Sequence, residues 1–256
     1  MNVVFTAGGM DSIPVQRDIR YREAPALEMD VYRPLQQSSI PLPAVIFVHG
    51  DGPPDWLRDI KDWGQYDSWG RLVAAYGMVG VIFNHRSTER GTQIREAAED
   101  IDSLLETVNA RAGEYGIDSN RLAIWVASAG GYLGARAAFN HRAAVRCLVI
   151  YYGLMEPIGA SEEDVATFSS TPALTSDGPS IFVARAGLDN PKLNTGLDAF
   201  AAAAIERGLE VEIHNHAAGH HAFDIVDESP RSKEIIGRSL EFLRIHLGAS
   251  GPVATG

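Results

Sequence analysis

The stretch RLAIWVASAGGYLGAR, residues 121–136, is the strongest structural signal in the chain and carries its first candidate functional residue. Its apolar run Leu122–Val126 is typical of a short strand that is buried on both faces. Ser128 follows between small residues, and a helical pattern begins directly after it. The stretch therefore predicts a buried strand, a sharp turn and a helix, with Ser128 at the turn.

Ser128 at this turn has two interpretations. A serine on a tight strand-to-helix turn projects its hydroxyl above the sheet edge, where a base and a substrate can reach it, and this arrangement is the nucleophile elbow. The elbow needs small neighbours, whereas Val126 stands where the usual G-x-S-x-G pattern has its first glycine. The alternative is a surface turn with Ser128 as an ordinary N-cap. The small neighbours are Ala127, Ala129, Gly130 and Gly131.

Apolar strands alternate with helical patterns along the chain. Connections of this length imply parallel crossovers, so the sequence predicts one α/β domain over residues 1–256, with a mostly parallel sheet of about eight strands and helices on both faces. The expected strands are Val15–Tyr21, Leu27–Tyr32, Ala44–Val48, Val79–Phe83, Leu122–Val126, Val145–Tyr152, Ser180–Ala184 and Leu209–Asn215. The expected helices are Tyr66–Tyr76, Ile94–Ala112, Gly131–Phe139, Asn194–Arg207 and Ser232–Leu247.

Two segments stand out from this alternation. Val15–Tyr21 and Leu27–Tyr32 are separated only by a short turn, so we expect an antiparallel hairpin at a sheet edge. Residues 153–178 are irregular and carry acidic residues, Ser, Thr and two prolines. An insertion there lies over the carboxyl edge of the sheet, and we expect a small cap that shapes a partly open pocket.

Composition excludes several classes of protein. The formal net charge of −11, without a Lys or Arg cluster, argues against nucleic acid as a partner. The single cysteine, Cys147, lies in an apolar run, so we expect a buried, inert thiol and no disulfide framework. The N-terminal residues have no basic region and too short an apolar run for a signal peptide, and we expect a cytoplasmic protein without a membrane span.

A glycine-rich loop, HGDG at residues 49–52, follows the expected strand Ala44–Val48. Backbone N–H groups at the end of a buried strand lie at the edge where open α/β sheets build their sites, and such donors can stabilise an oxyanion. The alternative is a loop whose glycines and prolines only turn the chain. Its position after an apolar strand and before the serine turn favours a functional role.

The order of three residues favours a catalytic serine. Ser128, Asp189 and His221 follow one another in the chain, and each comes directly after a strand that we expect to be buried. Loops after parallel strands meet at one edge of a sheet, and the order Ser, Asp, His is the one that α/β-hydrolases use.

The chain resembles the α/β-hydrolase superfamily, and within it the small esterases and the dienelactone-hydrolase-like or prolyl-oligopeptidase-like domains. The motifs that carry the resemblance are HGDG at 49–52, WVASAGG at 125–131, AGLDNP at 186–191 and GHHAF at 219–223. The chain departs from these families at Val126 in the elbow and at Asp51, where many of the esterases have another glycine. The dienelactone hydrolases use a cysteine nucleophile, so Ser128 points away from their reaction.

The resemblance implies a role for each residue. Ser128 is the nucleophile, His221 takes its proton, and Asp189 holds the imidazole in the right tautomer. The backbone N–H groups of Ala129 and of Asp51 or Gly52 form the oxyanion hole.

Other residues compete for these roles. His220 competes with His221, but the resembled families place the base just before a small residue and an aromatic one, as in His221-Ala222-Phe223. His85 follows an earlier strand and, with Arg86, is interpreted as a loop anchor. The alternatives to Asp189 are Asp177, Asp198 and Asp224. His214 and His216, spaced as alternate strand residues without a carboxylate or cysteine partner, are not expected to bind a metal.

We expect a carboxylic ester hydrolase that acts on small-molecule esters with short or medium acyl groups, without metal or organic cofactor. Two alternatives stay open: a peptidase or amidase of the same fold, and a hydrolase-fold protein that binds a ligand without turning it over, which Val126 in the elbow would explain. Neither the ester nor the oligomeric state, including a homodimer, follows from the sequence.

Overall fold

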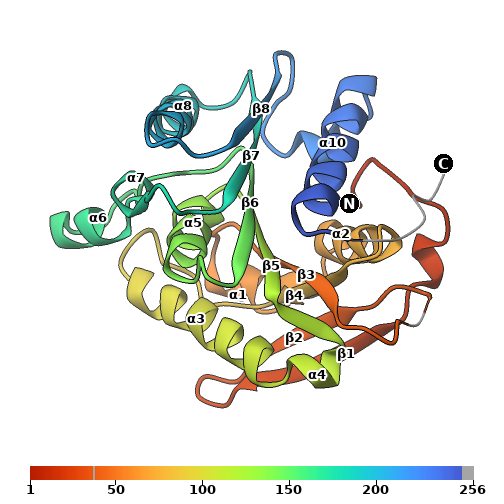
Figure 1. Ribbon diagram of the computed structural model, residues 1–256. Coiled ribbons are helices and arrows are strands. Elements are labelled where there is room, and N and C mark those ends of the chain that lie inside the picture. The colour runs from red at the N-terminus through yellow and green to blue at the C-terminus, as the bar shows by residue number, and fades with distance from the viewer. Residues whose placement is uncertain (37, 250–256) are drawn as a thin grey trace.

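Eight strands form one twisted sheet within residues 1–36 and 38–249, the part of the chain that the computed structural model describes (Figure 1). The order is β1-β2-β4-β3-β5-β6-β7-β8. β2 pairs antiparallel with β1 and with β4, and every other neighbouring pair is parallel. The prediction of a mostly parallel α/β sheet is confirmed. The strands are β1 (Val15–Arg22), β2 (Leu27–Tyr32), β3 (Leu42–Val48), β4 (Val79–Phe83), β5 (Ile117–Ala127), β6 (Val145–Tyr151), β7 (Ser180–Ala186) and β8 (Val211–His216).

Helices cover both faces of the sheet and bury two apolar cores. On one face α3, α5 and α8 pack over the strands, and on the other α2 and α10 do so. The central strands are therefore buried on both sides, which is why β3 and β4 have no polar residue at alternate positions. The helices are α1 (Pro54–Leu57), α2 (Gly64–Ala75), α3 (Ile94–Ala110), α4 (Ala112–Tyr115), α5 (Gly130–Asn140), α6 (Glu162–Phe168), α7 (Ser170–Ala173), α8 (Pro191–Glu206), α9 (Phe223–Val226) and α10 (Pro230–His246).

The parallel register brings the carboxyl ends of the central strands together. Val48 pairs with Val126, and Ala127 pairs with Tyr151. At the other side of the sheet Ala186 pairs with His216. The loops that follow these strands consequently emerge along one edge, as expected for an open α/β sheet.

Three elements differ from the sequence expectation. β5 begins at Ile117, because this residue pairs with Leu42 of β3 although the polar residues 118–120 interrupt the apolar run. Residues 153–178 are not wholly irregular but contain α6 and α7. β8 is an edge strand and is only partly buried, so the expectation that His221 follows a buried strand is wrong in that detail.

Within the described residues, none of the helices combines the length and the apolar character needed to cross a membrane.

Candidate active site

Ser128 lies at the turn between β5 and α5 in a left-handed backbone conformation, with φ of 53°. A non-glycine residue in this region costs about 1–2 kcal/mol, so the surrounding structure must hold it there. The turn is too tight for larger neighbours. A Cβ on Gly130 would lie 2.5 Å from the carbonyl oxygen of His49, and a Cβ on Gly131 would lie 2.5 Å from that of Leu154.

Val126 does not disrupt the turn, because Gly134 on the first turns of α5 makes room for it. Val126 is fully buried, and a Cβ added to Gly134 would lie 2.2 Å from its Cγ1. Val126 is larger than the glycine of the elbow pattern, and the absence of a side chain at Gly134 leaves the space that Val126 needs. Val126 therefore gives no steric reason for a spoiled elbow.

Gly134→Ala is expected to destabilise the protein by about 1–3 kcal/mol, because the new methyl group overpacks against Val126. The matched control is Gly196→Ala in α8, where a Cβ meets no atom within 4 Å among the described residues. That change should stabilise by about 0.5–1 kcal/mol. Urea unfolding of both variants measures the difference, and equal stability of the two would contradict the proposed fit.

His221 contacts both Ser128 and Asp189. Its Nε2 lies 2.9 Å from Ser128 Oγ, and its Nδ1 lies 2.6 Å from Asp189 Oδ2. An ionised carboxylate only accepts hydrogen bonds, so Nδ1 carries the proton, and Nε2 of the neutral ring accepts from the serine hydroxyl. The Asp189 side chain is 5% exposed and that of His221 is 39% exposed, so solvent reaches the imidazole but not the carboxylate.

The residues that compete with His221 and Asp189 for these positions lie elsewhere. His220 is exposed. Asp177 pairs with Arg142 at 2.8 Å and Asp198 with Arg185 at 2.8 Å. Neither of these two carboxylates makes a hydrogen bond or ion pair with His221 among the described contacts.

Asp224 has a structural role that the sequence did not reveal. It is fully buried and accepts hydrogen bonds from the Tyr152 hydroxyl at 2.5 Å, Trp69 Nε1 at 2.9 Å and Gln65 Nε2 at 3.2 Å. Burial raises the pKa of its carboxyl group, against the lowering effect of these donors. The Tyr152 ring packs on the His221 ring with centroids 4.6 Å apart. Asp224 thus supports the tyrosine on which the imidazole lies.

The HGDG loop after β3 lies against the serine turn. A Cβ on Gly50 would be 3.2 Å from Ser128 Cβ. The Asp51 carboxylate faces away, toward the loop after β4, where it accepts from Ser87 Oγ at 2.9 Å, from the Thr88 backbone N–H at 3.0 Å and from the Thr88 hydroxyl. The Ser87 hydroxyl is also 2.8 Å from the Gly52 carbonyl oxygen. The hydrogen bonds of the Asp51 side chain therefore fix the HGDG loop, and the backbone of this loop lies beside Ser128.

His49 and His85 also hold the HGDG loop in place. Their rings stack with centroids 3.5 Å apart, and the His85 backbone N–H donates to His49 Nε2 at 3.2 Å. His49 Nδ1 therefore donates to the Gly50 carbonyl oxygen at 2.7 Å. Burial lowers the pKa of both imidazoles, and the neighbouring His85 ring lowers the pKa of His49 further. Arg86 binds Asp100 and the Glu96 carbonyl, which confirms the interpretation of His85 and Arg86 as loop anchors.

No group of three or more His, Cys, Asp or Glu residues suited to a metal ion occurs in residues 1–36 and 38–249. His214 pairs with Glu212 at 2.7 Å and His216 with Asp227 at 2.8 Å. Cys147 is buried and unpaired within the described part of the chain, and burial raises the pKa of its thiol.

Comparison with known proteins gives a family and a fold. The BD-FAE family model matches residues 29–157. The chain is 30% identical over 132 residues to "Probable isoprenylcysteine alpha-carbonyl methylesterase ICME" of Oryza sativa subsp. japonica, covering 50% of this chain and 30% of that protein. It is 25% identical over 234 residues to ICMEL1 of Arabidopsis thaliana, also named a probable isoprenylcysteine alpha-carbonyl methylesterase, covering 91% of this chain and 43% of that protein. The chain therefore spans less than half the length of these two relatives.

Solved esterase structures share the fold. The thermophilic esterase Est2 of Thermogutta terrifontis superposes with a TM-score of 0.76 at 16% identity, covering 96% of each chain. The esterase of Pyrobaculum calidifontis superposes with a TM-score of 0.72 at 19% identity, covering 94% of this chain and 89% of that one. These likenesses establish an α/β-hydrolase fold for the chain.

Proposed function

The chain belongs to the BD-FAE family of the α/β-hydrolase superfamily, and we propose that it hydrolyses carboxylic esters through an acyl-serine intermediate. The observation that carries this proposal is the row of hydrogen bonds from Ser128 through His221 to Asp189, at the ends of β5, β8 and β7. The esterase names of the relatives and of the solved structures support the same reaction class.

The chemistry follows from the tautomer of His221. Ser128 Oγ attacks the ester carbonyl carbon while Nε2 takes its proton, and Asp189 stabilises the imidazolium that forms. The carbonyl oxygen gains the negative charge. The N–H of Ala129 and that of Asp51 or Gly52 are proposed to hold this oxygen. His221 then gives its proton to the leaving alcohol, the carbon–oxygen bond breaks, and an acyl-serine remains. Water attacks by the same steps in the second half and releases the acid.

The oxyanion assignment makes the carboxylate of Asp51 a positioning group. Asp51→Ala should lower kcat for p-nitrophenyl acetate by about 10–100-fold and leave KM nearly unchanged, because the loop N–H groups move relative to the transition-state oxygen. Thr88→Val, which removes one donor to that carboxylate, should lower kcat in the same direction by less. The control is Asp55→Ala, since Asp55 pairs only with exposed Arg58 among the described residues. Full kcat in Asp51→Ala would show that the Asp51 carboxylate does not position the N–H groups of the oxyanion hole.

Residues 153–178 are proposed to act as a small cap. Arg95 on α3 pairs with Glu163 and Asp164 of α6, each at 2.8 Å, and Phe168 is buried against the core. A cap of two short helices leaves room for small substrates, so short or medium acyl groups are proposed. A peptidase or amidase, or a protein that only binds its ligand, stays the alternative.

The experiment that tests the proposal is hydrolysis of p-nitrophenyl esters of increasing acyl length, with anilides of the same acids beside them. A methyl ester belongs in the panel because the two plant relatives are named methylesterases. Turnover of esters with little turnover of anilides supports an esterase. Preferred turnover of anilides supports the amidase, and inertness toward the whole panel supports the ligand-binding alternative.

A further inference from the structure

The ring of Tyr152 packs on the imidazole of His221, the proposed base. The two ring centroids are 4.6 Å apart, with an angle of 54° between the ring planes. Aromatic rings attract one another at centroid distances of about 4.5–7 Å. Among the described hydrogen bonds and ring contacts, the His221 side chain has two others, one to Ser128 and one to Asp189. Tyr152 therefore supplies one of the three contacts that fix the imidazole.

Tyr152 is itself held at its backbone and at its hydroxyl. Its φ of 40° lies in the left-handed region that bulky residues rarely adopt, and its N–H donates to the Ala184 carbonyl oxygen at 2.8 Å. Its hydroxyl donates to Asp224 Oδ1 at 2.5 Å, and both residues are buried. Ala222, directly after His221, also has a left-handed backbone, with φ of 63°. Such conformations persist where the surrounding structure imposes them, as it does at functional sites.

The three contacts of His221 do not all last through the proposed reaction. In the free protein the Ser128 hydroxyl donates to Nε2, and Nδ1 donates to Asp189. Once Ser128 is acylated, its Oγ carries no hydrogen, and Nε2 of the neutral ring has none to donate, so this hydrogen bond is lost. A ring held only by the hydrogen bond to Asp189 can turn about it. The imidazole therefore depends on Tyr152 more in the acyl-enzyme than in the free protein.

We propose that Tyr152, anchored by Asp224, is a positioning residue that holds His221 for the second half of the reaction, the hydrolysis of the acyl-serine. The inference rests on the proposed ester hydrolysis and assigns a role in it to a residue outside the triad.

The chemistry of the second half explains why this position matters. The water oxygen forms a bond to the acyl carbon while Nε2 of His221 takes a proton from the water. Nε2 then gives that proton to Ser128 Oγ as the bond between the acyl carbon and Oγ breaks. A displaced imidazole loses its alignment with the water. In the first half, by contrast, the hydroxyl of Ser128 still bonds Nε2 and restores the alignment.

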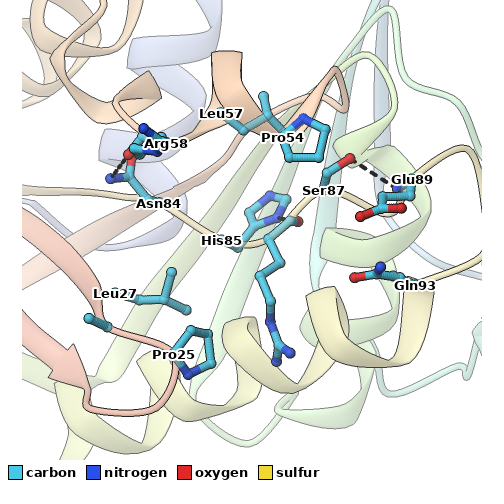
Figure 2. A pocket seen from close by; sticks show the side chains of 12 residues that line it. Pro25, Leu27, Pro54, Leu57, Arg58, Asn84, His85, Ser87, Glu89 and Gln93 are labelled. Atoms are coloured by element: carbon cyan, nitrogen blue, oxygen red, sulfur yellow. Dashed lines mark hydrogen bonds between the residues drawn. The ribbon is translucent and has the colours of Figure 1, made fainter.

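The HGDG loop has supports of its own. The segment between β4 and α3 holds this loop through Ser87, whose hydroxyl donates to the Gly52 carbonyl oxygen at 2.8 Å, and through His85, whose backbone N–H donates to His49 Nε2 at 3.2 Å. Figure 2 shows His85 and Ser87 on this segment, where they line a pocket. A change at Tyr152 should therefore leave the proposed oxyanion hole intact and act on the base.

Separate measurement of the two half-reactions tests the proposal. The burst of p-nitrophenol from p-nitrophenyl acetate, followed by stopped flow, gives the rate constant of acylation. The decay of the acyl-enzyme after removal of the substrate, followed by mass spectrometry of the intact protein, gives that of deacylation.

Two variants separate the ring of Tyr152 from its hydroxyl. Tyr152→Leu removes the ring, whereas Tyr152→Phe keeps the ring and loses the hydrogen bond to Asp224. The matched control is Tyr151→Phe, which removes the hydroxyl of the adjacent buried tyrosine, whose partner is Ser239 of α10.

Tyr152→Leu should lower the rate constant of deacylation by about 10–100-fold and that of acylation by less than about threefold. Tyr152→Phe should have a deacylation constant between those of Tyr152→Leu and the wild type, and Tyr151→Phe should change neither constant. The acyl-enzyme should consequently accumulate in both Tyr152 variants. Asp189→Asn, by contrast, should lower both constants, because its carboxylate balances the imidazolium charge in both halves.

Equal losses in the two half-reactions, or wild-type deacylation in Tyr152→Leu, would overturn the role of Tyr152 and leave the acyl-serine mechanism standing. If Tyr152→Leu does not fold, Tyr152→Phe decides, since it keeps the buried ring: its deacylation must be slower than that of Tyr151→Phe. A wild-type protein that forms no acyl-enzyme would overturn the proposed ester hydrolysis, and the role of Tyr152 with it.

Discussion

Ser128→Ala should lower kcat/KM for p-nitrophenyl acetate by roughly 10⁴-fold or more, to a level set by the remaining oxyanion hole and binding contacts. The hydroxyl is the group that attacks in the proposed mechanism, and its partner His221 Nε2, at 2.9 Å, has no other function in the first step. Alanine fits the turn sterically, so folding should survive. The measurement is steady-state hydrolysis together with the burst of p-nitrophenol, which should vanish.

A matched serine controls for general damage. Ser119 lies near the other end of the same strand, β5, and is partly buried like Ser128. Ser119→Ala should keep the burst and the turnover of the wild type. A Ser128→Ala protein with wild-type kcat/KM would exclude an acyl-serine at this position, whatever the other variants show.

Asp189→Asn should lower kcat by about 10³–10⁴-fold with a small change in KM. An asparagine amide can donate to His221 Nδ1, which favours the tautomer with the proton on Nε2, and such a ring cannot accept the proton of Ser128. The carboxylate would also no longer balance the imidazolium charge. Asp177→Asn and Asp198→Asn are matched controls, because both carboxylates pair with arginines. They should retain kcat.

Asp224→Asn provides the sharpest contrast with Asp189→Asn. Asp224 acts through the Tyr152 ring and does not contact His221 among the described hydrogen bonds, so its loss should lower kcat less than the loss of Asp189 does. A fully active Asp189→Asn beside an inactive Asp224→Asn would transfer the acid role to Asp224.

The sequence was sufficient for the parts of the structure that local patterns encode. Buried parallel strands appear in the sequence as apolar runs, and the residues that follow these runs are expected at one edge of the sheet. This is why Ser128, Asp189 and His221 could be predicted to meet, and the structure brings them within hydrogen-bond distance. The short helices α6 and α7 could not be predicted, because four to seven residues carry too little periodicity.

The supports of the site depend on contacts that no local pattern reveals. Asp51 was read as a departure from the glycine-rich motif, and its partners Ser87 and Thr88 lie on a loop more than thirty residues away, at 36 and 37 positions. Val126 appears in the sequence only as a departure from the elbow pattern. Gly134 appears only as one residue of an expected helix, so the fit between the two residues is not visible. Asp224 is in the sequence only one of the alternatives to Asp189, and no local pattern shows that it accepts a hydrogen bond from Tyr152, 72 residues away. In each of these three cases the contact joins residues whose local sequence gives no sign of it.

Covalent labelling of the protein by a fluorophosphonate, mapped by mass spectrometry of its peptides, identifies the nucleophile without reference to any substrate. We expect one label per chain on the peptide that carries Ser128, loss of esterase activity in step with labelling, and no label on Ser128→Ala. Labelling of another residue, or an active protein that fully resists the reagent, would contradict the proposed mechanism.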